Sequence, residues 1–145
     1  MKKLLLLYPV IVAAVVAAIA LSGASAAAPP APVVLGFSKH SVGPDLYLGT
    51  VDGGGIVEML ILDRSYTDDA QFFSAIVRVN EEDKWFAARM WGSLEYATLE
   101  THLRGKVTDG NWLQGAKVLE EGELESFDPL TFTGTLTVQP KHGDD

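Results

Sequence analysis

The clearest pattern in the chain is an alternation of apolar and polar residues over positions 98–108. One face of this stretch carries apolar or small side chains, namely Leu99, Thr101, Leu103, Gly105 and Val107. The other face is polar and carries Thr98, Glu100, His102, Arg104, Lys106 and Thr108. Because alternate side chains of a β-strand point to opposite sides, the pattern predicts a strand with one buried and one solvated face.

The same alternation recurs near the C-terminus, where threonines separate Phe132, Gly134, Leu136 and Val138. Further strands are predicted over residues 33–37, 46–52, 56–63, 72–80 and 111–119. The triple glycine at 53–55 supplies the positive φ angles that a tight hairpin needs. Half-buried strands require partners and a core, so we predict an all-β domain, a small antiparallel meander barrel or sandwich of seven or eight strands.

One segment is ambiguous between strand and helix. Read as a strand, residues 84–97 place Phe86 and Met90 on one side and the two tryptophans of the segment on the other. Read as a helix, residues 81–97 have three acidic residues in the first turn and an apolar stripe at helical spacing. We favour the strand, because it continues the hairpin spacing, and an α+β fold with one helix near 81–97 is the alternative.

The N-terminus has the pattern of an export signal. Two lysines precede an apolar run over residues 4–21, and Ala24 and Ala26 stand at the small residues that a signal peptidase reads. We expect a signal peptide over 1–26, with a retained membrane anchor as the alternative. Residues 27–32 form an Ala/Pro leader, 33–139 a single β domain and 140–145 a tail, and the domain is expected to be secreted or periplasmic.

Charge and cysteine content exclude several kinds of site. Without Lys2 and Lys3 the chain has 9 basic and 19 acidic residues, a net charge of −10. Such an acidic chain is repelled by nucleic acid and by anionic membranes, so we expect no nucleic-acid partner, and a membrane role only if the N-terminal segment is retained. The absence of cysteine excludes disulfides, thiolate metal sites and a cysteine nucleophile.

Ionisable residues offer few candidates for catalysis or metal binding. His102 is flanked by Glu100 and Arg104 on one strand face, which allows a general base but is also typical of a solvated face. Two acidic groups contain enough oxygen ligands for calcium, one at 63–69 and one at 120–128. Neither has the spacing of a calcium loop, and alternate glutamates at 121, 123 and 125 are explained as an outward face, so we predict no metal site and no cofactor.

Glu58 and the aromatic residues are the candidates for ligand binding. Glu58 interrupts an apolar strand, where it would be a polar anchor if it faced the interior, although the solvent-facing orientation is favoured. Trp85, Arg89 and Trp91 would share one face of a strand, and Trp112 follows nearby. Such a face can stack on a sugar ring or another flat ligand, although tryptophans that merely fill the core are the common alternative.

Two segments, T-D-G-N-W-L-Q-G-A-K-V at 108–118 and F-T-G-T-L-T-V at 132–138, resemble the Gly- and Thr-rich strands of small secreted barrels, such as calycin-type binders or the allene oxide cyclase-like barrel. This resemblance supports the fold class. We therefore expect an exported, non-catalytic module that binds a small apolar or sugar-like ligand. The alternatives are a small extracytoplasmic lyase, isomerase or hydrolase with a barrel carboxylate or histidine as base, and an envelope or surface interaction protein.

Overall fold

A computed structural model describes residues 28–143, and the predicted signal segment 1–26 lies outside this range. The described chain forms eight consecutive strands: β1 (Val33–Ser41), β2 (Leu46–Val51), β3 (Gly55–Tyr66), β4 (Ala70–Glu81), β5 (Lys84–Glu95), β6 (Glu100–Gly110), β7 (Lys117–Phe127) and β8 (Leu130–Gln139). The ambiguous segment is therefore strand β5, and the helix alternative is wrong. No helix in residues 28–143 is long and apolar enough to cross a membrane.

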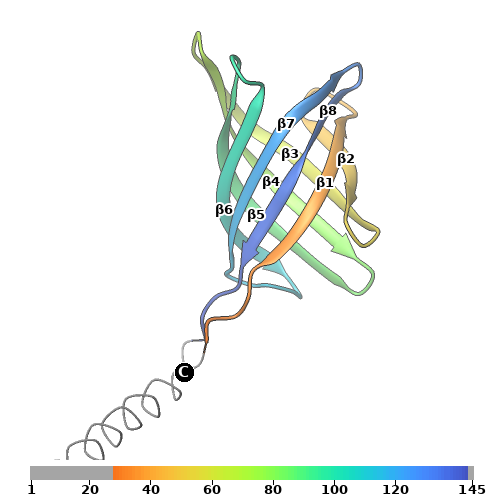
Figure 1. The fold of residues 1–145 in the computed structure, drawn as a ribbon, viewed down its shortest axis with the longest axis vertical. Coiled ribbons are helices and arrows are strands. Elements are labelled where there is room, and N and C mark those ends of the chain that lie inside the picture. Colours follow the sequence, from red (N-terminus) through yellow and green to blue (C-terminus); the bar gives the residue numbers. More distant parts are fainter. Residues whose placement is uncertain (1–27, 144–145) are drawn as a thin grey trace, which may run out of the picture.

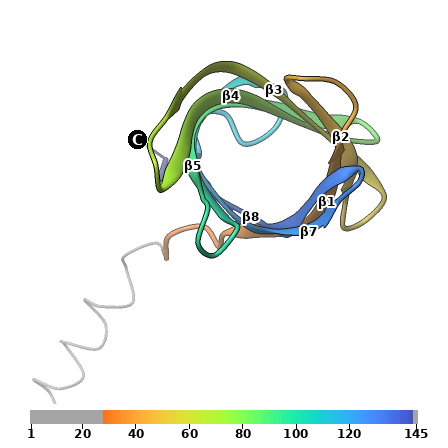
Figure 2. The ribbon, with the colours of Figure 1, turned by 90° about the horizontal axis from the view of Figure 1, so that it is seen from above.

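The strands form a closed antiparallel meander barrel, as Figures 1 and 2 show. Each strand pairs with the next one along the chain, and β1 pairs with β8 from Val33 opposite Val138 to His40 opposite Thr131. The barrel is one of the two all-β architectures that the alternation predicts. Closure pairs every strand on both sides, so the sheet has no free edge.

The barrel interior is filled by the apolar positions of the alternation. In β4, the side chains of Phe73, Ala75, Val77 and Val79 are buried while their neighbours are half-buried or exposed. Glycines occupy inward positions where two strands approach closely. At Gly134 an added Cβ would overlap the carbonyl oxygen of Glu121 on β7, so this position of β8 requires glycine.

The two ends of the barrel differ. We call the end with the turns 41–46, 66–70, 95–100 and 127–130 the mouth, and the opposite end the base. Residues 28–32 and 140–143 both leave the barrel at the base, where Gln139 Nε2 donates a hydrogen bond of 3.0 Å to the Pro30 carbonyl (Figure 1).

The loop between β6 and β7 closes the base. Its Trp112 packs against the buried ring of Phe86, with the ring centroids 5.8 Å apart. The Asn111 side chain links the loop to β5 by accepting a hydrogen bond of 2.8 Å from the Trp85 amide. Residues 111–116 were expected to begin a strand, but they form this loop, and β7 begins at Lys117. Similarly, Leu99 lies in a turn with φ of 59° rather than in β6.

Candidate functional site

The structure separates the five residues singled out in the sequence. Arg89 and Trp91 lie together on the outer face of β5. Trp85 is on the same face near the base, half-buried under the guanidinium of Arg78 at 4.7 Å, and Trp112 is part of the base loop. Glu58 is exposed on the outer face of β3, so the favoured orientation is confirmed and the inward one, which would make it an anchor in the lumen, is wrong. His102 is also exposed, so neither proposed base faces the barrel interior.

The register of the strands arranges outward side chains in rows around Trp91. One row runs from Ser74 on β4 through Trp91 and Arg104 to Leu119 on β7. The next row toward the mouth runs through Phe72, Ser93 and His102, and the next toward the base through Ile76, Arg89, Lys106 and Lys117. Side chains opposite one another on neighbouring strands lie about 5 Å apart, so these rows form one continuous surface.

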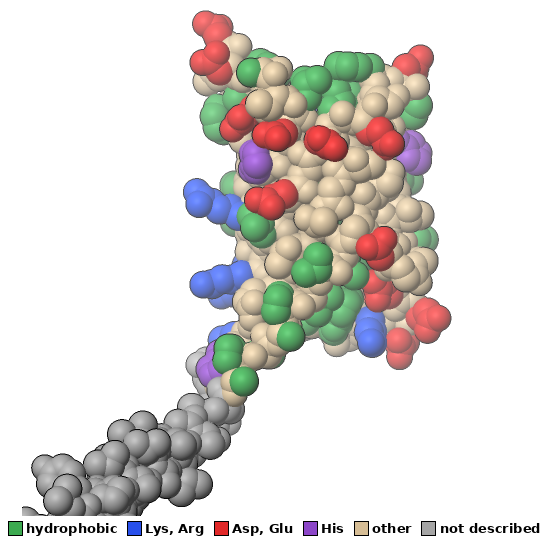
Figure 3. Space-filling view, viewed as in Figure 1, with side chains coloured by type: hydrophobic (Ala, Val, Ile, Leu, Met, Phe, Trp, Pro, Cys, Tyr) green, Lys and Arg blue, Asp and Glu red, His purple; other side chains and the backbone are tan. Residues whose placement is uncertain are grey.

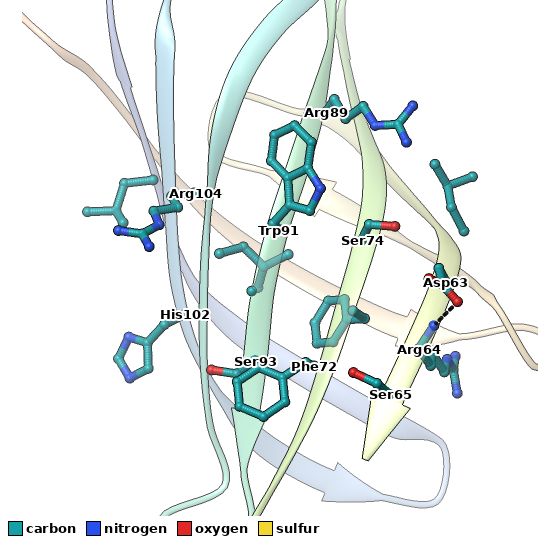
Figure 4. A pocket seen from close by; sticks show the side chains of 15 residues that line it. Asp63, Arg64, Ser65, Phe72, Ser74, Arg89, Trp91, Ser93, His102 and Arg104 are labelled. Carbon is teal, nitrogen blue, oxygen red and sulfur yellow. Dashed lines mark hydrogen bonds between the residues drawn. The ribbon is translucent and has the colours of Figure 1, made fainter. Parts of the chain in front are cut away.

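A groove of about 960 Å³ lies along this surface. Ser74 and Ser93 have small side chains, so the surface is hollow above them, and larger side chains form the sides of the groove. Figure 4 shows Trp91 between Arg104 and Ser74, with Arg89 beside the ring on one side and Phe72 with Ser93 on the other. The Trp91 side chain is 52% exposed, so its ring is available to a ligand. The remaining apolar lining comes from Leu62, Phe73, Leu103 and Leu119.

The groove is basic although the chain is acidic. Arg89 lies 5.9 Å from the centroid of the Trp91 ring, and Arg104 stands opposite Trp91 on the next strand. Among the described residues, no carboxylate lies within salt-bridge distance of either arginine. His102 is 3.8 Å from a Glu100 oxygen, and this contact is an ion pair only when the histidine is protonated. Asp63 and Arg64 also line the groove, so its lining carries three arginines and one carboxylate. Arg89 and Arg104 have no salt-bridge partner within residues 28–143 and lie beside an exposed indole.

The basic surface continues from the groove toward the base of the barrel. Lys106 lies opposite Arg89, and Lys117 lies opposite Lys106. Both lysines also line a second hollow of about 580 Å³, whose lining includes Pro29, Pro30 and His142. In Figure 3 acidic side chains of the visible face form a band toward the mouth and a second group at the lower right, and lysine and arginine side chains stand at the left edge and at the lower right. We call the cations Arg89, Arg104, Lys106 and Lys117 the basic track.

The lumen holds a charge pair that the sequence pattern did not single out. Lys39 on β1 and Glu120 on β7 are each 1% exposed and form an ion pair across the interior. Lys39 also donates to the Met59 sulfur at 3.4 Å and lies 4.5 Å from the centroid of the Phe37 ring. The strand period could have revealed the inward orientation of both residues. Lys39 lies two residues from buried Phe37, and Glu120 lies two residues from buried Val118, so each shares the inner face of its strand.

A cavity of about 100 Å³ lies beside this pair, toward the mouth. Aromatic rings form part of its wall, with Tyr47 and Phe132 in an edge-on contact at 5.9 Å. Burial raises the pKa of the Tyr47 phenol, with the nearby Asp45 carboxylate adding to the rise and the Arg64 guanidinium opposing it. The phenol therefore stays neutral at physiological pH and is a hydrogen-bonding group of the wall.

No protein-family model and no curated protein matches this sequence. Within residues 28–143, no three His, Asp or Glu side chains are grouped closely enough to hold a metal ion. The groove and the lumen are the features of residues 28–143 whose side-chain chemistry points to a function.

Proposed function

We propose that this protein is an exported binding module for an acidic polysaccharide, which lies in the groove across β4 to β7. The observation that supports this function is the exposed Trp91 ring between two arginines that have no counter-ion among the described residues. An indole face stacks on the C–H face of a sugar ring, and arginine binds carboxylates through two parallel hydrogen bonds. The two contacts together match a sugar that carries a carboxylate.

The basic track favours a polymer over a single sugar. It extends from the groove to the second hollow near the base, so successive charged sugars of one chain would meet successive cations. The net negative charge of the protein opposes a polyanion at long range. At physiological ionic strength charges are screened over about 8 Å, so the local track determines the interaction at contact. Binding would weaken as salt is added, because the exposed arginines and lysines are themselves screened.

The test uses polygalacturonate as the probe and its fully methyl-esterified form as the matched neutral polymer. We expect saturable binding of the acid by isothermal titration calorimetry, accompanied by a change in tryptophan fluorescence, and little binding of the ester. Trp91→Ala and Arg104→Gln should each weaken binding about tenfold, because each removes one central contact.

Two control variants lie outside the groove. Phe127 is 74% exposed near the mouth, and Arg78 contacts Trp85 on another part of the wall, so Phe127→Ala and Arg78→Gln should leave the affinity unchanged. Equal binding of the acid and the ester would contradict the proposal. So would equal binding of single-stranded DNA, since any polyanion would then suffice, or an effect of the control variants as large as that of Trp91→Ala.

A further inference from the structure

The lumen contains buried polar atoms without partners, next to the cavity. Glu120 uses one carboxylate oxygen to accept a hydrogen bond from Lys39, but its Oε2 has no partner among the described residues. The hydroxyl of Thr101, which is 5% exposed, also has none. Leaving such groups unpaired inside a protein costs free energy, so buried polar atoms without partners in a native fold call for an explanation.

Glu120 and Thr101 both line the same cavity. On the β6–β7 ladder Thr101 lies opposite Gly122 and Glu120 lies opposite Leu103, which places Thr101 diagonally across from Glu120 on the inner face. The chain packs tightly at Gly122, where an added Cβ would lie 2.9 Å from the Thr101 hydroxyl and 3.0 Å from the Thr133 carbonyl oxygen. An acceptor and a hydroxyl on neighbouring strands therefore border the same small cavity.

Apart from Lys39, Arg64 and Gln71, the rest of the cavity wall is largely apolar. It is formed by rings and aliphatic chains, namely Tyr47, Met59, Ile61, Phe73, Leu103 and Phe132. Toward the mouth, half-buried residues cover the cavity, including Leu94 at the end of β5, Leu130 at the start of β8 and Gln71. A β-bulge after Ile61 turns Arg64 toward this side, where it bonds the Pro44 carbonyl at 2.6 Å. The opening is thus covered by side chains rather than by backbone.

We propose that the lumen binds a small neutral molecule with an apolar body and a single hydroxyl group, such as a phenol. The hydroxyl donates to Glu120 Oε2 and accepts from the Thr101 hydroxyl, and the ring packs among the aromatic side chains. The ligand is neutral because Lys39 and Glu120 already balance each other's charge, and the remaining cation of the wall, Arg64, is paired with Asp45 at 3.1 Å. The volume of about 100 Å³ is below that of engineered cavities of about 150 Å³ that bind benzene, so a phenol enters only when side chains on the mouth side of the cavity, such as Leu94 and Leu130, move outward.

The test compares phenol with anisole, which has the same ring but lacks the hydroxyl hydrogen. Binding to the full β domain is followed by the NMR shifts of the Thr101 methyl and of the inward residues. We expect phenol to bind about tenfold or more tightly than anisole, the ratio expected for one hydrogen bond to a charged acceptor. Thr101→Val should reduce phenol affinity several-fold and leave the affinity for anisole unchanged.

Two further variants distinguish binding in the lumen from a loss of folding and from binding in the groove. The double variant Lys39→Met with Glu120→Leu replaces the ion pair by apolar side chains, and it should abolish the preference for phenol. Trp91→Ala removes stacking in the groove and should leave phenol binding unchanged. Equal affinity for phenol and anisole would overturn the proposal, as would shifts confined to the groove or the absence of saturable binding, which would indicate that water alone occupies the cavity.

Discussion

The groove and the lumen use the same kinds of side chain, cations beside aromatic rings, under opposite conditions of solvation. In the groove, Arg89 and Arg104 stand in water and have no carboxylate partner among the described residues. In the lumen, Lys39 is buried and paired with Glu120. A solvated cation costs the fold almost nothing and can bind a ligand, whereas a buried one must be neutralised within the fold. Substitutions in the lumen should therefore change stability, whereas substitutions in the groove should weaken polysaccharide binding with little change in stability.

The largest expected effect comes from breaking the buried pair. Lys39→Met leaves Glu120 charged and unpaired in the interior, and it should lower the free energy of unfolding by about 3–5 kcal/mol. The double variant Lys39→Met with Glu120→Leu removes both charges and should regain most of that loss or exceed wild type. Urea unfolding followed by circular dichroism measures both. A single variant as stable as wild type would show that the pair is solvated.

A smaller loss is expected where strands β7 and β8 approach closely at Gly134. Gly134→Ala would push an added methyl group into the Glu121 carbonyl of β7, and it should cost about 1–3 kcal/mol. The matched control is Gly43→Ala in the β1–β2 turn, where no atom lies within 4 Å of an added Cβ and φ is not positive. Equal thermal midpoints of the two variants would contradict the close approach of β7 and β8.

The unpaired hydroxyl of the lumen predicts a change of the opposite sign. Thr101→Val replaces a buried hydroxyl without a partner by a methyl group of the same shape, so it should raise the free energy of unfolding by about 1–2 kcal/mol. Thr135→Val, at an exposed position of β8, is the control and should be nearly neutral. Loss of stability in Thr101→Val would mean that the hydroxyl has a partner in solution.

The smallest change in stability is expected in the groove. Trp91→Ala truncates a side chain that is 52% exposed, and it should alter the free energy of unfolding by less than about 1 kcal/mol. The same variant should weaken polygalacturonate binding about tenfold. Scanning calorimetry of unfolding and titration calorimetry of polygalacturonate binding, both on one preparation of the variant, separate the effect on stability from the effect on affinity. A large loss of stability would place Trp91 among the residues that hold the wall together and would break the contrast between the two regions.

Much of the fold follows from the alternation alone. The inward residues of β4, β6 and β8 are those that the period of two places on the apolar face, with only Leu99 displaced into a turn. The secondary structure of residues 84–97 was harder to predict, because their tryptophans and methionine fit both the helical and the strand period. The pairing of this segment with β4 and β6 makes it a strand. Tertiary context thus overrides local preference at this segment.

The candidate sites were only partly predictable. Arg89 and Trp91 share a strand face, so their proximity follows from spacing, but the placement of Arg104 beside them depends on the β5–β6 register. Lys39 and Glu120 are far apart in sequence and lie on strands separated by β8. The strand period places each of them on the inner face. A single charged residue at such a position is nevertheless expected to reach solvent unless its partner across the lumen is known. The acidic run around Glu120 concealed that one of its members points inward.

Both ends of the described chain leave the barrel at the base, joined there by the hydrogen bond from Gln139 to Pro30. A reporter protein or a surface linker fused before residue 28 or after residue 143 would therefore project away from the lumen opening. Attached to a sensor chip by either terminus, the barrel would stand with its mouth toward the solution. The same domain could then be immobilised in two ways, each leaving the mouth accessible to a dissolved probe.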